Sequence, residues 1–310
     1  MDQVLIKDEP KNGDLLFQSV QRAVLKLKDY ALLLKLRLSL LVLFSTLVGF
    51  WLASPSQMDL WLLAKLALGA FLIIGGANAF NEIIERNPDA LMKRTAIRPL
   101  PSGRMGLREA WGIALLSSIS GILILSLGVN GLTALLALTA FCLYVFAYTP
   151  LKRIGPWCVF VGAFPGAIPA MMGPVAIHHA ITPLSWFLFG IVFLWQFPHF
   201  CAIAWVARED YERAGFKVLT HPENPLFTAY QILLFSCALV GVSPLLTLMH
   251  HAGTYYLIGS LCLSLLLVTY ALVFWFNHSR SYARQMMGMA LLYLPLLFIL
   301  MILDKVPVSW

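Results

Sequence analysis

Acidic and amide side chains gather where an apolar segment ends near residue 80. Asn81 and Glu85 are four residues apart, so they would share one face of a helix. Pro88 is expected to end or bend that helix, because proline cannot donate to the helical ladder. Asp89 would then turn back toward the same cavity. Since Mg²⁺ is held by one or two carboxylates together with phosphate oxygens, this spacing predicts a magnesium site.

Basic side chains accompany the acidic ones. Arg94 and Arg98 lie just downstream, and the guanidinium fork suits phosphate oxygens. Another cationic pair, Lys152 and Arg153, ends a later apolar segment. Metal-binding acids beside phosphate-binding bases indicate a diphosphate site. An ordinary solvated loop that only sets membrane topology is the alternative at this point, and acidic residues at the mouth of a span argue against it.

A second polar loop repeats this combination. Asp210 stands at the mouth of an apolar segment, with Tyr211 beside it and Lys217 nearby, so a second metal-bridging carboxylate is expected here. Within the preceding segment, His199 lies among aromatic residues that include Trp195. A buried histidine beside a proline can simply satisfy a backbone carbonyl, but the aromatic neighbours favour a large flat ligand.

The elements that must position these residues are membrane helices. Of the 310 residues, 60% are hydrophobic and 12% are charged, whereas globular proteins average about 45–50% and about 25%. Apolar segments of about 20 residues can cross a bilayer as helices. The sequence therefore predicts an all-α polytopic bundle of about nine spans, at 36–53, 58–80, 108–127, 131–149, 157–177, 184–206, 226–249, 254–276 and 285–303.

The basic residues fix the expected orientation. With nine spans, all of the 22 lysines and arginines except Lys65 and Lys305 fall on one side, which the positive-inside rule assigns to the cytoplasm. We expect residues 1–35 to form a cytoplasmic segment, either an interfacial helix or a solvated basic leader. Residues 36–303 would form the membrane domain, and residues 304–310 a short outer tail. The candidate site then faces the cytoplasm.

Several motifs together resemble those of the UbiA-type membrane prenyltransferases, and among these the enzymes that farnesylate haem. The resemblance covers the chain from about the first span to the ninth. Glu85 stands where the family usually has Asp. The motifs that carry the resemblance are Asp89 to Thr95, Arg98 to Pro101 with Gly103, Tyr148 to Arg153, Gly162 and Ala163, Pro165 to Gly173, Trp195 and Gln196, Pro198 to Phe200, Asp210 and Tyr211, and Ala214 and Gly215.

This resemblance implies an inner-membrane transferase. The implied reaction moves the farnesyl group of farnesyl diphosphate to a vinyl group of haem B with addition of water, giving haem O for haem–copper oxidase assembly. The implied catalytic and Mg²⁺-binding residues are Asn81, Glu85, Asp89 and Asp210. The implied substrate-binding residues are Arg94, Arg98, Lys152, Arg153, Lys217, Tyr148, Tyr211 and His199.

Two alternatives stay open. A prenyltransferase of the same fold could act on an aromatic acceptor of quinone synthesis. A secondary transporter could also place acidic residues near broken helices, although transporters hold such charges near the bilayer midplane. The expected partners are farnesyl diphosphate, haem B and membrane lipid. Haem A synthase or oxidase assembly proteins are the expected protein partners. No nucleic acid is expected.

Overall fold

A computed structural model describes residues 12–218 and 224–306, with side chains from residue 19 onward. Residues 1–11 of the predicted N-terminal segment and residues 307–310 of the predicted tail lie outside the described part. The helices are α1 (Asn12–Leu33), α2 (Leu36–Ala53), α3 (Leu60–Leu91), α4 (Leu107–Gly128), α5 (Gly131–Cys142), the π-helical segment η1 (Leu143–Tyr148), α6 (Thr149–Ile154), α7 (Trp157–His178), α8 (Pro183–Val206), α9 (Arg208–Arg213), α10 (Pro225–Val242), α11 (Leu245–Leu248), α12 (Thr254–Asn277) and α13 (Arg280–Leu303).

Within the described residues, nine helical segments are long and apolar enough to cross a membrane. They are α2, α3, α4, the continuous run from α5 to α6, α7, α8, the run from α10 to α11, α12 and α13. The predicted all-α polytopic fold is therefore confirmed. The second span differs most from its prediction, because it continues to Leu91 rather than ending at residue 80. The charged side chains at its end are buried and paired with other charges, so a prediction from hydropathy alone placed the end of the span too early.

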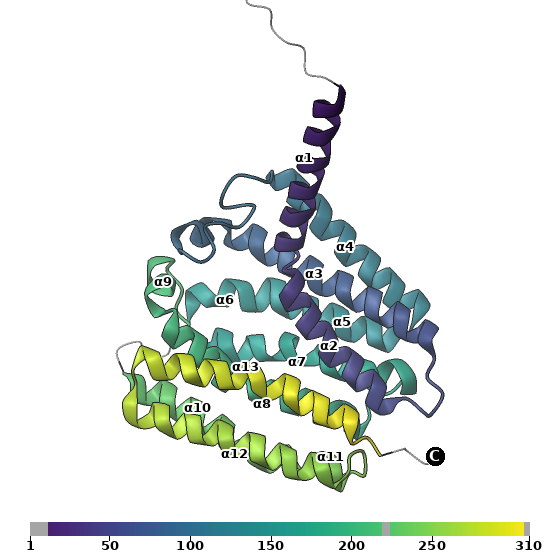
Figure 1. Ribbon diagram of the computed structural model, residues 1–310, viewed down its shortest axis with the longest axis vertical. Coiled ribbons are helices and arrows are strands. Elements are labelled where there is room, and N and C mark those ends of the chain that lie inside the picture. The colour runs from purple at the N-terminus through teal and green to yellow at the C-terminus, as the bar shows by residue number, and fades with distance from the viewer. Residues whose placement is uncertain (1–11, 219–223, 307–310) are drawn as a thin grey trace, which may run out of the picture.

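Helices α7 and α8 lie at the centre of the bundle. Helix α7 packs against α2, α5 and α8, while α8 also packs against α10 and α13 (Figure 1). At the crossing of α2 and α7, a Cβ on Gly173 would meet the backbone of Thr46 and Phe50. Small residues allow membrane helices to approach this closely, so α2 and α7 touch through their backbones.

One basic residue, Lys305, closes the bundle at the end where α2 finishes. Its ammonium donates hydrogen bonds to the carbonyl oxygens of Trp51 (2.7 Å) and Ser54 (2.6 Å) at the end of α2. Carbonyl groups at a helix C-terminus lack intrahelical partners and interact favourably with cations. Lys305, two residues beyond the end of α13, therefore stabilises the end of the first spanning helix.

Helix α1 projects from the bundle at the opposite end (Figure 1). Three side-chain contacts hold it there: Lys26 and Tyr30 each bind Glu109 at 2.9 Å, and Arg104 binds Asp29 at 3.0 Å. Leu25 and Leu27 are exposed on this helix. A helix with exposed leucines and lysines is the form that an interfacial segment takes, and that placement stays a prediction.

Candidate active site

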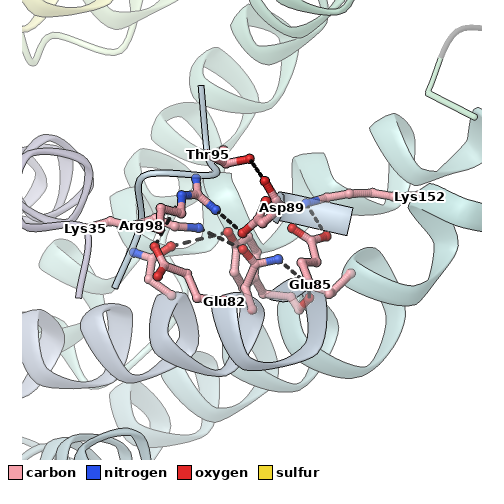
Figure 2. A network of polar contacts seen from close by, with 11 residues as sticks. Lys35, Glu82, Glu85, Asp89, Thr95, Arg98 and Lys152 are labelled. Atoms are coloured by element: carbon pink, nitrogen blue, oxygen red, sulfur yellow. Dashed lines mark hydrogen bonds and ion pairs between the residues drawn. The ribbon is translucent and has the colours of Figure 1, made fainter. Parts of the chain in front are cut away.

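The C-terminal end of α3 presents one acidic face. Glu82, Glu85 and Asp89 follow one another at intervals of three and four residues, with Asn81 beside Glu82, so a single helix carries them on neighbouring turns. Their exposures are 0% for Glu82, 1% for Asn81 and Asp89, and 4% for Glu85. Buried carboxylates must be paired or neutralised, and Figure 2 shows that cations from three other segments meet them.

Each carboxylate has a cationic partner. Lys152 from α6 places its Nζ 2.7 Å from Glu85 Oε1. Arg98, from the loop between α3 and α4, places Nη1 2.6 Å from Asp89 Oδ2 and Nε 3.5 Å from Glu82 Oε1. These two cations thus pair with all three carboxylates.

A third cation, Lys35, reaches the same face from the junction of α1 and α2. Its Nζ donates to Asn81 Oδ1 at 2.7 Å. The Asn81 amide donates in turn to Thr149 Oγ1 at 3.0 Å, which fixes the orientation of the amide. Burial, together with the charge of Arg98, lowers the pKa of Lys35 to about 8, while the charge of Glu82 opposes the shift. Lys35 also has a left-handed backbone, with φ 46°, a conformation that costs an L-residue about 1–2 kcal/mol.

Pro88 was expected to end or bend α3, and it does not end the helix. The helix continues through Pro88 to Leu91, and Asp89 joins the acidic face as part of the last turn. A proline inside a helix removes one hydrogen bond and crowds the preceding turn. Here the last turn is held from outside: the Thr95 hydroxyl donates to the Asp89 carbonyl at 2.8 Å, and Arg98 binds the Asp89 carboxylate.

Lys152 is positioned by the π-helical segment that precedes α6. The Thr149 hydroxyl donates to the carbonyl of Tyr144 at 2.8 Å, and Lys152 Nζ lies 4.6 Å from the centre of the Tyr148 ring. A Cβ on Gly162 would collide with that ring, so the glycine makes room for it. π-Helical turns are frequent at functional sites, and this one directs Tyr148 and Lys152 toward Glu85.

The second polar loop packs beside the first. Met92 forms an apolar cluster with Ala214 and Phe216, and the backbone N–H of Lys217 donates to the carbonyl of Lys152 at 2.7 Å. The two loops that the sequence singled out therefore lie next to each other. Asp210 binds Arg213 at 2.8 Å, so its carboxylate is paired within its own helix, α9.

The remaining predicted residues occupy different surroundings. Arg94 and Arg153 are exposed. Tyr211 and Lys217 line a cavity beside α9. His199 lies inside α8, where its ring stacks on Trp195 with centroids 4.7 Å apart. The His199 Nδ1 atom is buried, with no hydrogen-bond partner among the described residues.

The α3 face is chemically suited to a hard divalent cation. Its donors are carboxylate and amide oxygens, the ligands that Mg²⁺ takes together with phosphate oxygens. Both Glu82 carboxylate oxygens are buried without a hydrogen-bond partner among the described residues. Among the described residues, no three or more His, Cys, Asp or Glu side chains are grouped to hold a metal ion. The carboxylates of this face are paired with Lys152 and Arg98.

Two residues of this network, Glu82 and Lys35, were missed by the sequence analysis. Glu82 could have been found from its spacing, since it lies three residues before Glu85 and seven before Asp89. Lys35 gave no local signal. It lies 46 residues before Asn81 in the chain, and only the packing of α2 against α3 brings it to the site.

Comparison with known proteins gives a consistent result. The model of the UbiA prenyltransferase family matches residues 42–294. The chain is 41% identical to protoheme IX farnesyltransferase of Koribacter versatilis over 290 residues, which cover 90% of this chain and 94% of that protein. It is 40% identical to protoheme IX farnesyltransferase of Solibacter usitatus over 291 residues, which cover 90% and 99%.

Solved structures show the same fold. A structure of digeranylgeranylglyceryl phosphate synthase matches with a TM-score of 0.76 at 19% identity, covering 90% of this chain and 98% of that one. A UbiA homologue from Archaeoglobus fulgidus, bound to GPP and Mg²⁺, matches with a TM-score of 0.64 at 19% identity, covering 88% and 99%.

Proposed function

The chain belongs to the UbiA prenyltransferase family, and on that premise we propose that it transfers the farnesyl group of farnesyl diphosphate to a vinyl group of haem B. Water is added in the same reaction, and the products are haem O and diphosphate. The observation that carries the acceptor is the likeness at 41% identity to a protoheme IX farnesyltransferase over 94% of its length. The prenyl transfer itself follows from the family.

The cations of the site would bind the diphosphate. Lys152, Arg98 and Lys35 converge on one face from three segments. A diphosphate that enters here takes these cations as its own partners, and they stabilise the negative charge that develops as the carbon–oxygen bond breaks. The farnesyl carbon becomes an allylic cation as diphosphate leaves, and a haem vinyl group attacks it. Water then captures the resulting carbocation and loses a proton to solvent, which leaves a hydroxyl group.

The carboxylates that these cations release would hold Mg²⁺. We assign this role to Glu82, Glu85 and Asp89, together with the amide oxygen of Asn81. The bound ion would add positive charge for the leaving diphosphate. Asp210 stays a proposed further ligand, and it must first leave Arg213.

His199 and Trp195 are proposed to face the porphyrin. Their rings are stacked and tilted by only 13°, and the Trp195 indole is fixed by a hydrogen bond of 2.6 Å to the Ala290 carbonyl. Such a fixed aromatic pair suits a flat acceptor. Tyr211 and Lys217 at the rim, with Arg94 and Arg153, are the remaining proposed substrate contacts.

The test is a product assay with purified protein and farnesyl diphosphate. Haem B and 4-hydroxybenzoate are offered as acceptors with Mg²⁺ present, and the products are identified by mass spectrometry. We expect the hydroxyethylfarnesyl haem and no prenylated phenol, and chelation of the metal should stop the reaction. Prenylation of the phenol with haem B unchanged would assign the chain to quinone synthesis instead.

The protein is a multi-pass membrane protein. We propose that it lies in a bacterial inner membrane with the N-terminus and the α3 face toward the cytoplasm, because the basic residues gather at that end. Haem O would then pass to haem A synthase or oxidase assembly proteins. Reporter fusions after residues 103 and 180 should be active on the cytoplasmic and the outer side, respectively, and the reverse pattern would invert the orientation.

A further inference from the structure

A cavity opens at the inner rim, beside the network of acids and bases. Its volume is about 470 Å³, within the range of about 300–1,000 Å³ that is usual for ligand sites. It lies between the end of α6, the start of α7, helix α9 and the loop that follows α9. The cavity is lined by Ile154, Gly155, Pro156, Arg208, Tyr211, Glu212, Gly215, Phe216, Lys217 and Val218.

The charges in this cavity favour an anion. Arg208 and Lys217 line it, and Glu212 is the only acidic residue among the described residues that line it. The Arg208 guanidinium lies 5.1 Å from the Trp205 ring, which holds this cation at the cavity through a cation–π contact. The backbone N–H of Lys217 is tied to the Lys152 carbonyl. Both cations therefore belong to segments that are fixed next to the active site.

The Phe216 ring lies between the cavity and Lys152 of the proposed active site. Phe216 lines it and is buried, and Lys152 Nζ lies 5.7 Å from the centre of the Phe216 ring. The same Lys152 holds Glu85. On the membrane side, the apolar wall continues into Ile154 and Trp157, which are 70% and 73% exposed. A ligand here meets an apolar surface, two cations and the diphosphate site together.

We propose that this cavity binds the carboxylate edge of the porphyrin acceptor, with Arg208 and Lys217 as the partners of its two propionates. This inference rests on the proposed function. Haem B carries its propionates on one edge and its vinyl groups on the opposite edge. Anchoring the propionates at the water-facing rim leaves the vinyl edge free to approach the farnesyl cation. Ile154 and Phe216 would contact the flat face of the ring.

A comparison of protohaem with its dimethyl ester isolates this contact. The ester keeps the ring and the vinyl groups but removes both negative charges. Binding to the purified full-length protein is followed by the Soret absorbance, for wild type and for the variant that combines Arg208→Gln with Lys217→Gln. Arg280→Gln is the matched control, because Arg280 lies at the same rim but pairs with Glu209 at 3.8 Å, outside the cavity.

We expect wild type and the Arg280→Gln control to bind the free acid about tenfold more tightly than the ester, as two partly exposed charge pairs allow. The double variant should bind the acid and the ester with equal affinity, and it should bind the ester as wild type does. Unchanged preference for the acid in the double variant would overturn the proposal. A loss confined to the binding of a farnesyl diphosphate analogue would also overturn it, by assigning the cavity to the donor.

These outcomes distinguish a failure of the propionate site from a failure of the proposed farnesyl transfer. Wild-type protein that farnesylates protohaem while the double variant keeps its preference for the acid would refute only the role of the cavity. Wild-type protein that neither binds nor farnesylates protohaem would refute the proposed function itself.

Discussion

Glu82 is the most enclosed acidic residue of the α3 face, with 0% exposure. Among the described residues its ion-pair partner is Arg98, at 3.5 Å. Glu82→Gln keeps the shape of the side chain and removes its charge, so it tests the electrostatic role. We expect farnesyl transfer to fall by about 100-fold, the loss typical of an electrostatic group at a reacting centre, as measured by the rate of haem O formation.

Glu109→Gln is the control for this change. Glu109 binds Lys26 and Tyr30 at the start of α4, away from the α3 face. Partly exposed pairs contribute little, so this variant should keep its activity within about twofold of wild type. Comparable activity in Glu82→Gln and Glu109→Gln would exclude Glu82 from the site.

For Lys35 we predict an effect on substrate binding, because this residue contacts Asn81 rather than a carboxylate. Lys35→Met removes the charge and keeps much of the side-chain length. We expect the KM for farnesyl diphosphate to rise about tenfold while the KM for haem B is unchanged, as for a lost binding contact to one substrate. Lys28→Met, on the exposed surface of α1, should leave both values unchanged. Equal increases in both KM values for Lys35→Met would indicate a structural role instead.

At this scale the sequence predicted the chemistry better than the contacts. Asn81, Glu85, Asp89, Arg98 and Lys152 were all predicted for one site, and the structure brings them together. Their signal was local, either spacing along one helix or position at the end of a span. The partners of a charge depend on packing between distant segments, so the pairing of the acids with these particular bases could not be predicted.

At the scale of elements, the crossing of α2 and α7 sets a steric limit. A methyl group at Gly173 would meet the α2 backbone at Thr46 and Phe50, which cannot turn aside as a side chain would. Gly173→Ala should lower the free energy of unfolding by about 1–3 kcal/mol, as other overpacked contacts do. The measurement is the midpoint of thermal unfolding of the purified protein in detergent.

Gly190→Ala is the matched control, since a Cβ at Gly190 in α8 would meet nothing within 4 Å. Alanine is favoured over glycine inside a helix by about 1 kcal/mol, so this variant should be as stable as wild type or more stable. If the two substitutions shifted the midpoint equally, the close approach of α2 and α7 would not be what limits residue 173.

The spans themselves were predictable because each is a continuous apolar segment, a signal that needs no tertiary information. The end of α3 was not, because its polar last turns are stabilised by Arg98 and Lys152 from other segments. The π-helical segment Leu143–Tyr148 was also beyond prediction. Its sequence, LYVFAY, is as apolar as an ordinary helical turn, so no residue in it marks the irregular geometry.

At the scale of the whole molecule, the pairing of charges predicts that metal and diphosphate bind together. Mg²⁺ alone would take Glu85 from Lys152 and leave a buried ammonium without a partner, and removing one member of a buried pair costs about 3–5 kcal/mol. A diphosphate alone would leave the carboxylates unpaired. Saturating Mg²⁺ should therefore tighten the binding of a non-ionising thio analogue of farnesyl diphosphate by about tenfold or more.

Isothermal titration calorimetry of the purified protein measures this coupling in both directions. The analogue should tighten Mg²⁺ binding by the same factor, since coupling between two sites is reciprocal. Ca²⁺, which accepts longer and less regular ligand distances, is a useful comparison ion. Equal Mg²⁺ affinity with and without the analogue would contradict the exchange of partners.

The contact that Lys305 makes can form only after almost the whole chain has been synthesised. It lies 254 residues after Trp51, the residue whose carbonyl it binds. The first spanning helix is therefore synthesised long before Lys305. Until Lys305 is made, the C-terminal end of α2 lacks this hydrogen-bond partner. Phe44 and Phe298, whose ring centres lie 5.9 Å apart, are under the same constraint. The joining of the first span to the ninth is thus a late event in the biogenesis of the protein.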